Sequence, residues 1–197
     1  MHTERLLLIG CGILEKEIRY LDQKNHWDLE LVFLDSVFHC NFQKLAQSLK
    51  RTLNNHRNRD CLVCYGSCHP LMDQILDRPG TLRIQSQNCV EMLLGKAFFQ
   101  KELLCGAFFL LEDWAKKWDF ILSQTYTRCR PEVMREIFQS SRNSFLAVKT
   151  PCSDDFQLQA EQAATMMQVP LRWKEVTLEH LEAVLTSAIA QKRNVHE

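Results

Sequence analysis

Short apolar runs alternate along the chain with longer segments whose apolar residues recur at helical spacing. Residues 6–9 form a continuous apolar run, and in the segment that follows Leu14, Ile18 and Leu21 share one helical face. The runs that predict strands are 6–9, 29–34, 61–65, 82–84, 106–111, 145–148 and 171–176. This regular alternation predicts an α/β fold with a mainly parallel sheet and helices on both faces, a Rossmann-like three-layer sandwich.

Capping residues and prolines predict where several helices begin. Asn41 precedes a periodic pattern over residues 42–53 and suits an N-cap, and Pro70 suits the first position of a short helix that ends at Leu76. A further helix is expected from Asp154 to Met167. The chain has 197 residues and shows no repeat, low-complexity tract or linker, so we expect one α/β domain over residues 1–197.

Charge and cysteine content exclude several classes of protein. Acidic and basic residues number 24 each, which leaves no cationic field for nucleic acid. No apolar run approaches the roughly 20 residues that span a membrane. The nine cysteines are odd in number and follow no secretory leader, so we expect a cytoplasmic protein. The box that ends at Cys11 resembles a bacterial lipoprotein cleavage site, but the apolar core before it is shorter than the about 7–15 residues of a leader.

Three cysteines each follow a predicted strand and precede a predicted helix: Cys11, Cys68 and Cys89. Because parallel strands end at the same edge of a sheet, we expect these side chains to converge. Thiolates at helix amino termini are stabilised, and three soft ligands suit zinc or an iron–sulfur cluster of the 4Fe–4S type with one open coordination position. The alternative is that each is simply a small buried residue.

Histidines and acids in the same loops are candidates for proton transfer. His39 and His69 could each serve as a fourth ligand or as a general acid–base, because an imidazole titrates near neutral pH. Glu91, Glu112 and Asp113 are possible proton carriers, although acids at helix starts more often act as caps.

The remaining cysteines are expected to be structural or have no assigned role. Cys61 and Cys64 have the spacing of a ligand pair, but residues three apart on a strand point to opposite faces, so we expect them in the core. Cys40 has no assigned role. The cysteines without partner spacing are Cys105, Cys129 and Cys152.

The glycines on either side of Cys11, with Asp35 ending the next predicted strand, resemble a dinucleotide-binding fingerprint. The third glycine is missing, because Glu15 stands there and its carboxylate would repel a pyrophosphate. We therefore do not expect a bound nucleotide.

A series of short motifs resembles the uncharacterised bacterial and archaeal family DUF1638. The motifs are Cys11-Gly-Ile-Leu-Glu-Lys-Glu17, Phe38-His39, Tyr65-Gly-Ser-Cys68, Asn88-Cys89 with Leu94-Gly95, Gly106 to Trp114, and an alanine-rich helix over residues 160–167 before Val169-Pro170. The resemblance implies that Cys11, Cys68 and Cys89 are the family's cysteines. It also implies a link to corrinoid-dependent methyltransferases of anaerobes. His69 and Pro70 stand where the family usually has glycines, which favours a histidine ligand over an anion-binding loop.

Three hypotheses for function remain. The leading one is a metal-binding protein with a three-cysteine site at the carboxyl edge of the sheet. As an enzyme it would be a metal- or iron–sulfur-dependent lyase or methyltransferase of sulfur or methyl-group metabolism. Its substrate would be a small molecule, with His69, His39 or Glu91 handling protons. The second is a non-catalytic partner or chaperone of a corrinoid-dependent methyltransferase system. The third is a metal-free cysteine nucleophile, Cys11.

Overall fold

The computed structural model describes residues 5–194, and the chain falls into two compact units. The first unit comprises the chain up to Leu93 together with the segment from Leu178 onwards, and the second comprises Leu94–Thr177. Each unit contains its own parallel sheet. The expected single domain over residues 1–197 stays a prediction.

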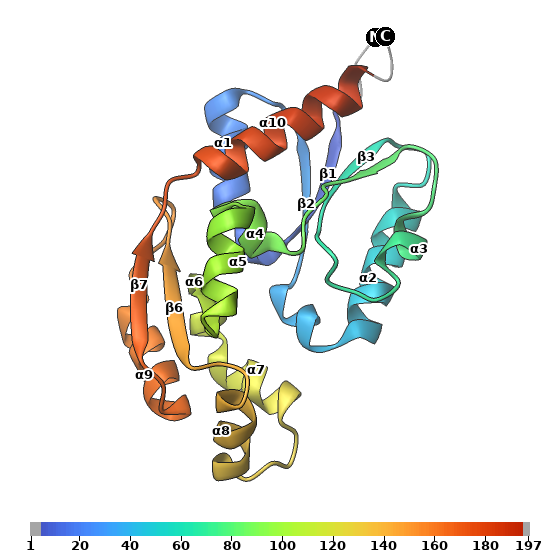
Figure 1. Ribbon diagram of the computed structural model, residues 1–197. Coiled ribbons are helices and arrows are strands. Elements are labelled where there is room, and N and C mark those ends of the chain that lie inside the picture. Colours follow the sequence, from blue (N-terminus) through green and yellow to red (C-terminus); the bar gives the residue numbers. More distant parts are fainter. Residues whose placement is uncertain (1–4, 195–197) are drawn as a thin grey trace. The chain divides into compact units, whose positions relative to one another are not determined.

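The sheet of the first unit is built around a central apolar strand (Figure 1). Its strands, in the spatial order β2-β1-β3-β4, are β2 (Glu30–Leu34), β1 (Leu7–Cys11), β3 (Cys61–Cys64) and β4 (Thr81–Arg83). All three pairings are parallel, and every residue of β1 and β3 is buried. Continuous apolar runs are expected of strands covered on both faces, which is how the sequence of these two strands reads.

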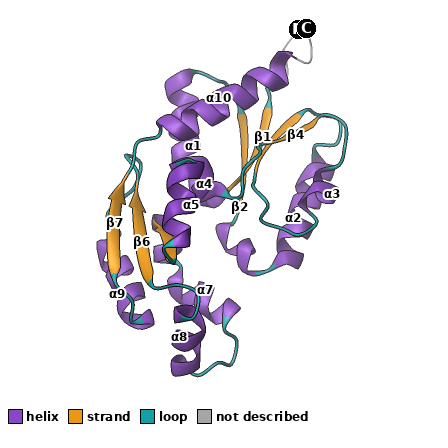
Figure 2. Cartoon of the chain, viewed as in Figure 1, coloured by secondary structure: helices purple, strands orange, loops and turns teal. Residues whose placement is uncertain are grey.

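Helices cover this sheet on both sides (Figures 1 and 2). They are α1 (Glu15–Asn25), α2 (Phe42–Asn55), α3 (Met72–Leu76), α4 (Cys89–Leu94) and α10 (Glu179–Asn194), with the 3-10 turns η1 (Gly12–Leu14) and η2 (Ser36–Cys40). The cap at Asn41 is confirmed, because its side chain accepts a hydrogen bond from the backbone N–H of Lys44 at 3.0 Å. The prediction for Pro70 is wrong, because a turn from His69 to Met72 precedes α3.

The second unit has a three-stranded parallel sheet with an aromatic core. Its strands, in the order β5-β6-β7, are β5 (Ala107–Leu111), β6 (Ser144–Lys149) and β7 (Leu171–Glu175). Its helices are α5 (Lys96–Leu104), α6 (Glu112–Lys116), α7 (Trp118–Thr125), α8 (Pro131–Gln139) and α9 (Gln157–Met167).

Neighbouring aromatic residues of β5 serve the two faces of this sheet, as the twofold repeat of a strand requires. Phe108 contacts Trp118, Phe138 and Phe145 with ring centroids 5.4–5.5 Å apart. Phe109 stacks instead on a ring of α5, that of Phe99, at 5.0 Å. Strand β5 is therefore covered on both faces by apolar side chains.

The predicted α/β class with parallel strands and helices on both faces is confirmed, with two differences in detail. The strands divide between two sheets rather than one. Helix α9 begins at Gln157 instead of Asp154, because the backbone N–H of Asp154 donates to the carboxylate of Glu112 and Ser153 closes a turn with Thr150. Within residues 5–194, no helix has both the length and the apolar character that a membrane crossing needs.

Candidate functional site

Cys11 is the last residue of β1 and is only 1% exposed. The chain leaves the strand through Gly12, where an added Cβ would lie 3.1 Å from the carbonyl oxygen of Leu34 and 3.6 Å from the backbone nitrogen of Ser36. A glycine therefore favours the close approach of the end of β1 to the start of η2. The second glycine of the apparent fingerprint brings Cys11 next to the turn that carries His39.

A second close backbone contact brings together the loops that carry Cys68 and Cys89. An added Cβ at Gly66 would lie 2.5 Å from backbone atoms of both Gln87 and Asn88. The backbone N–H of Ser67 also donates to the carbonyl of Gln87 at 2.9 Å. The loop after β3 and the loop before α4 are thus held together at the carboxyl edge of the sheet.

The three predicted cysteines and His39 lie together at this edge, and we call these four residues the thiol cluster. The Cys11 Sγ atom lies 3.4 Å from Nε2 of His39. Cys89 is hydrogen-bonded to Cys11 through its side chain, and Cys68 is hydrogen-bonded to His39. The convergence expected from the positions of these cysteines after parallel strands is present in the structure.

Contacts within the thiol cluster favour a negative sulfur at Cys11 and a positive ring at His39. The hydrogen bond with Cys89 and the proximity of His39 outweigh burial and lower the pKa of Cys11 to about 5. Burial lowers the pKa of His39, but hydrogen bonds to Cys11 and Cys68 and the negative charge of Cys11 raise it overall to about 10. Near neutral pH the pair is therefore a thiolate and an imidazolium.

The neighbouring thiols stay protonated. The pKa of Cys89 is raised well above the ordinary thiol value by its hydrogen bond to Cys11 and by burial. The Cys89 thiol therefore donates this hydrogen bond, and the Cys11 sulfur accepts it. Burial and the nearby charge of Cys11 raise the pKa of Cys64 to about 12. Cys11 is thus set apart from Cys64 and Cys89 as the anion.

Tyr65 is a member of the site that the sequence reasoning missed. It follows β3, is fully buried, and its ring stacks on that of His39 with centroids 6.2 Å apart. Burial and the charge of Cys11 raise the pKa of its phenol. Within residues 5–194 its hydroxyl has no hydrogen-bond partner of good geometry. A tyrosine beside a glycine at the end of a buried strand was the signal available in the sequence.

His69 and Glu91 are engaged in local structure. Nδ1 of His69 accepts from the backbone N–H of Leu71 at 2.9 Å, and its ring meets the edge of Phe42. The carboxylate of Glu91 accepts from the Ser86 hydroxyl at 3.1 Å and from the Gln87 N–H at 3.4 Å, and its own backbone N–H donates to the capping side chain of Asn88 at 3.0 Å. Their roles in proton transfer stay predictions.

The remaining sequence candidates lie apart from the thiol cluster or contact other partners. Cys61 lies 3.4 Å from the Thr81 hydroxyl, whereas Cys64 contacts the Met92 sulfur at 3.6 Å, so the two thiols face different neighbours as expected of a strand. Glu112, in the second unit, forms an ion pair with Lys116. The other residues with a stated expectation are Asp113, which pairs with Lys117, the half-buried Cys40 and Cys152, and the exposed Cys105 and Cys129.

The fit of the thiol cluster to a metal is mixed. Thiolate sulfur and imidazole nitrogen are the donors that zinc and iron–sulfur clusters prefer. Among residues 5–194, however, no three His, Cys, Asp or Glu side chains stand in an arrangement that could hold a metal ion. The donor chemistry therefore suits a thiophilic metal, whereas the arrangement of the side chains does not.

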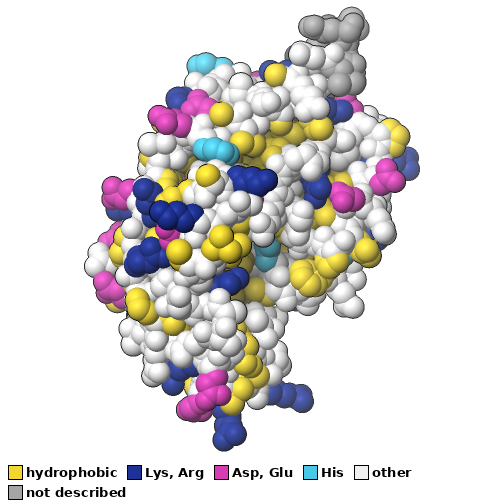
Figure 3. All heavy atoms as spheres, viewed as in Figure 1, with side chains coloured by type: hydrophobic (Ala, Val, Ile, Leu, Met, Phe, Trp, Pro, Cys, Tyr) yellow, Lys and Arg dark blue, Asp and Glu magenta, His cyan; other side chains and the backbone are white. Residues whose placement is uncertain are grey.

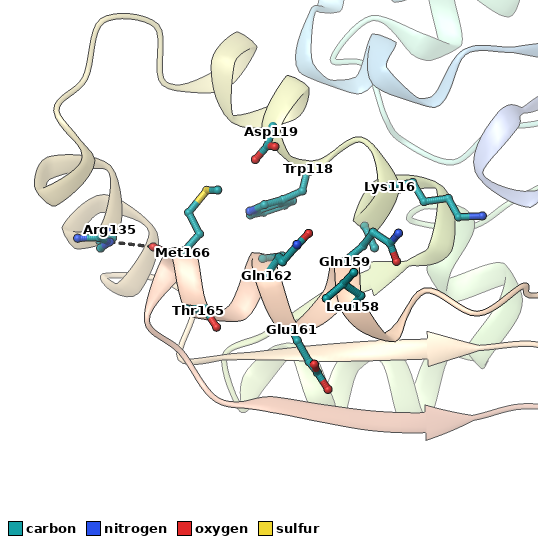
Figure 4. Close-up of a pocket in the computed structure, with 12 residues that line it drawn as sticks. Lys116, Trp118, Asp119, Arg135, Leu158, Gln159, Glu161, Gln162, Thr165 and Met166 are labelled. Carbon is teal, nitrogen blue, oxygen red and sulfur yellow. Dashed lines mark hydrogen bonds between the residues drawn. The ribbon is translucent and has the colours of Figure 1, made fainter.

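The second unit offers a different kind of site, an open hollow of about 730 Å³ beside α9 (Figure 4). Trp118, Gln162 and Met166 line it, together with charged groups that include Lys116 and Arg135. Arg135 donates to the carbonyl oxygen of Met166 at 2.8 Å, and Lys116 pairs with Glu112. None of the lining residues is a thiol or an imidazole, so the hollow has the means to bind but no evident reactive group.

Comparison with known proteins gives one match. A family model described as a protein of unknown function, DUF1638, matches residues 33–185. The matched region includes His39, Cys68 and Cys89 and begins after Cys11. No curated protein and no solved structure matches the chain.

Proposed function

The chain belongs to the DUF1638 family, and we propose that it carries out covalent thiol chemistry in which Cys11 is the nucleophile and His39 the proton donor. The observation that carries this proposal is the contact of 3.4 Å between Cys11 Sγ and His39 Nε2 within the thiol cluster. A thiolate beside an imidazolium is the usual form of an activated cysteine.

The reaction class follows from the two charges. The Cys11 sulfur attacks an electrophilic carbon or sulfur atom of a small molecule, a covalent bond to that atom forms, and the bond to the leaving group breaks. His39 gives its proton to the leaving group, which departs neutral. Cys89, as a thiol hydrogen-bonded to Cys11, keeps the resting sulfur anionic without competing for the electrophile.

Site-resolved alkylation tests this proposal. The native chain is treated at pH 7 with a limiting amount of iodoacetamide, and each of the nine cysteines is quantified by mass spectrometry. We expect Cys11 to be labelled faster than Cys64, although both residues are only 1% exposed. Equal and slow labelling of Cys11 and Cys64 would contradict the proposal.

A thiophilic metal centre is the second candidate. The donor set favours it, because Cys11 contacts both Cys89 and His39, and Cys68 contacts the same histidine. Bound there, zinc or a 4Fe–4S cluster would supply Lewis acidity or an open site for a sulfur- or methyl-bearing substrate. The side chains would have to move first, because as they stand within residues 5–194 they form no metal-binding group.

Elemental analysis separates the two candidates. Protein purified without oxygen is assayed for zinc, iron and acid-labile sulfide, and so are the Cys89→Ser variant and the control Cys61→Ser. Metal that is lost only on substitution of Cys89 would support the metal centre. A metal-free protein of normal stability with rapid labelling of Cys11 would support the thiol chemistry.

Two further expectations from the sequence stand as proposals. A cytoplasmic location fits nine free cysteines, because thiols persist in reducing compartments. Basic and acidic side chains are both present on the face drawn in Figure 3, and the net charge is zero, so a small-molecule substrate is favoured over nucleic acid.

A role as non-catalytic partner of a corrinoid-dependent methyltransferase system predicts that Cys→Ser changes in the thiol cluster leave function intact.

A further inference from the structure

Two thiols of the first unit are in direct contact although they lie far apart in the sequence. Cys11 ends β1, and Cys89 begins α4. Their side chains are hydrogen-bonded, and both are buried, at 1% and 3% exposure. Such a contact between two reduced cysteines is the starting point for a disulfide, if the backbone allows it.

The backbone around the pair is held by contacts that do not involve the thiols. Gly10 of β1 is paired with Cys64 of β3, so the chain just beyond β3 runs beside Cys11. From there the close approach of Gly66 to Asn88 fixes the residue that precedes Cys89. Burial and backbone pairing keep the two sulfurs adjacent in the reduced chain.

We propose that Cys11 and Cys89 form a dithiol–disulfide couple that exchanges with small-molecule disulfides. The inference rests on the proposed nucleophilic role of Cys11 and assigns Cys89 the task of releasing the first product. It adds an electron-transfer reaction, in which the protein gives up two electrons and the substrate disulfide takes them.

The exchange balances in two steps. The Cys11 thiolate attacks one sulfur of the substrate, the substrate S–S bond breaks, and the leaving thiolate takes a proton from His39. Cys89 then gives its proton to His39, its sulfur attacks the mixed disulfide on Cys11, and a Cys11–Cys89 bond forms. The second half of the substrate leaves as a thiolate and is protonated, so one disulfide is consumed and two thiols are released.

Other cysteines of the unit are less suited to the second step. Cys64 contacts the sulfur of Met92 at 3.6 Å. Cys68 is hydrogen-bonded to His39. Both Cys68 and His39 are half-buried, whereas the Cys11–Cys89 pair is buried. We therefore expect a small disulfide to enter beside Cys68 and His39.

Disulfide mapping tests the couple. The full chain is equilibrated with mixtures of oxidised and reduced glutathione, quenched with acid, and mapped by non-reducing peptide mass spectrometry. The expected result is a Cys11–Cys89 disulfide that appears and disappears with the glutathione ratio. In Cys89→Ser, glutathione should stay attached to Cys11 at a level at least tenfold higher than in the native chain, whereas the matched control Cys64→Ser should still form the Cys11–Cys89 link.

The outcomes separate this inference from the proposed function. Rapid alkylation of Cys11 without a Cys11–Cys89 link at any ratio would overturn the couple and leave the nucleophile in place. A link from Cys11 to Cys68 would also overturn it. If Cys11 neither alkylates nor forms a mixed disulfide, both proposals fail. Because the mapping of the native chain needs no variant, a folding defect in Cys89→Ser does not affect it.

Discussion

The carboxyl edges of the two sheets differ in chemistry, although both sheets are parallel and have buried apolar inner strands. In the second unit, β5 ends beside Glu112, whose buried carboxylate pairs with Lys116 and accepts from the backbone of Asp154. In the first unit, β1 ends at Cys11. The pKa of this cysteine is lowered by a hydrogen bond from the Cys89 thiol and by the neighbouring His39 imidazolium. Both anions have a cationic partner, but a carboxylate is a weak nucleophile, whereas a thiolate is a strong one and is available for reaction.

The largest effect on stability is expected in the aromatic core of the second unit. Phe145 is fully buried against Phe108, Trp118 and Phe138. Phe145→Ala should lower the free energy of unfolding by about 3–5 kcal/mol, because it leaves a cavity among these rings. Denaturant titration measures the change, with Leu158→Ala as control, since Leu158 is 61% exposed and should stay within about 0.5 kcal/mol. Equal effects would show that this core is not packed as described.

Gly66→Ala tests the backbone contact that holds the first unit's edge together. The new Cβ would lie 2.5 Å from backbone atoms of Gln87, which cannot move aside as a side chain can. We expect a loss of about 1–3 kcal/mol in the free energy of unfolding and slower alkylation of Cys11, because Cys89 is displaced from it. Ser67→Ala, at the exposed next residue, should change neither quantity. A stable Gly66→Ala chain with unchanged labelling would count against the described packing.

His39→Gln tests the ion pair. Without the imidazolium the pKa of Cys11 rises, so less thiolate is present at pH 7, and we expect alkylation of Cys11 to slow by about tenfold. The hydrogen bond from Cys89 remains and keeps part of the effect. His69→Gln is the matched control, because Nδ1 of that ring accepts from the backbone N–H of Leu71. Equal slowing in both variants would remove His39 from its assigned role.

Tyr65→Phe should have the smallest effect. The buried hydroxyl lies near the Cys11 sulfur but makes no hydrogen bond of good geometry within residues 5–194, so its removal deletes a desolvated polar group at little cost. We expect the free energy of unfolding to stay the same or to rise by up to about 1 kcal/mol. Thermal and chemical unfolding measure this. A loss greater than about 1 kcal/mol would show that the hydroxyl is bonded to the thiol cluster after all.

Much of the fold followed from the sequence because the apolar runs are distinct. The runs at residues 6–9 and 61–65 predicted β1 and β3, and the convergence of Cys11, Cys68 and Cys89 followed from their positions after strands. The division into two sheets did not follow, because a run such as 106–111 shows that a strand exists but not which strand it pairs with.

The identity of the partner of Cys11 also could not be predicted. His69 adjoins Cys68 in the sequence, but its ring is turned toward the backbone of Leu71, whereas η2 carries His39 to Cys11. The direction of a side chain in a short turn depends on contacts such as that of Gly12 with Leu34, which no periodicity reveals. Tyr65 was missed for the same reason, because the sequence gives no sign that a buried tyrosine contacts His39 rather than only the apolar core.

The ionisation of Cys11 is the property on which the account depends most. Because its pKa is lowered to about 5, the thiolate should be present above that pH and lost below it, and the raised pKa of His39 should keep the ring positive until about pH 10. The difference in thiolate ultraviolet absorbance between the native chain and Cys11→Ser, followed against pH, measures this without any reagent entering the core. A midpoint near pH 5 is predicted, and a midpoint near the ordinary thiol value of about 8.5 would contradict the account.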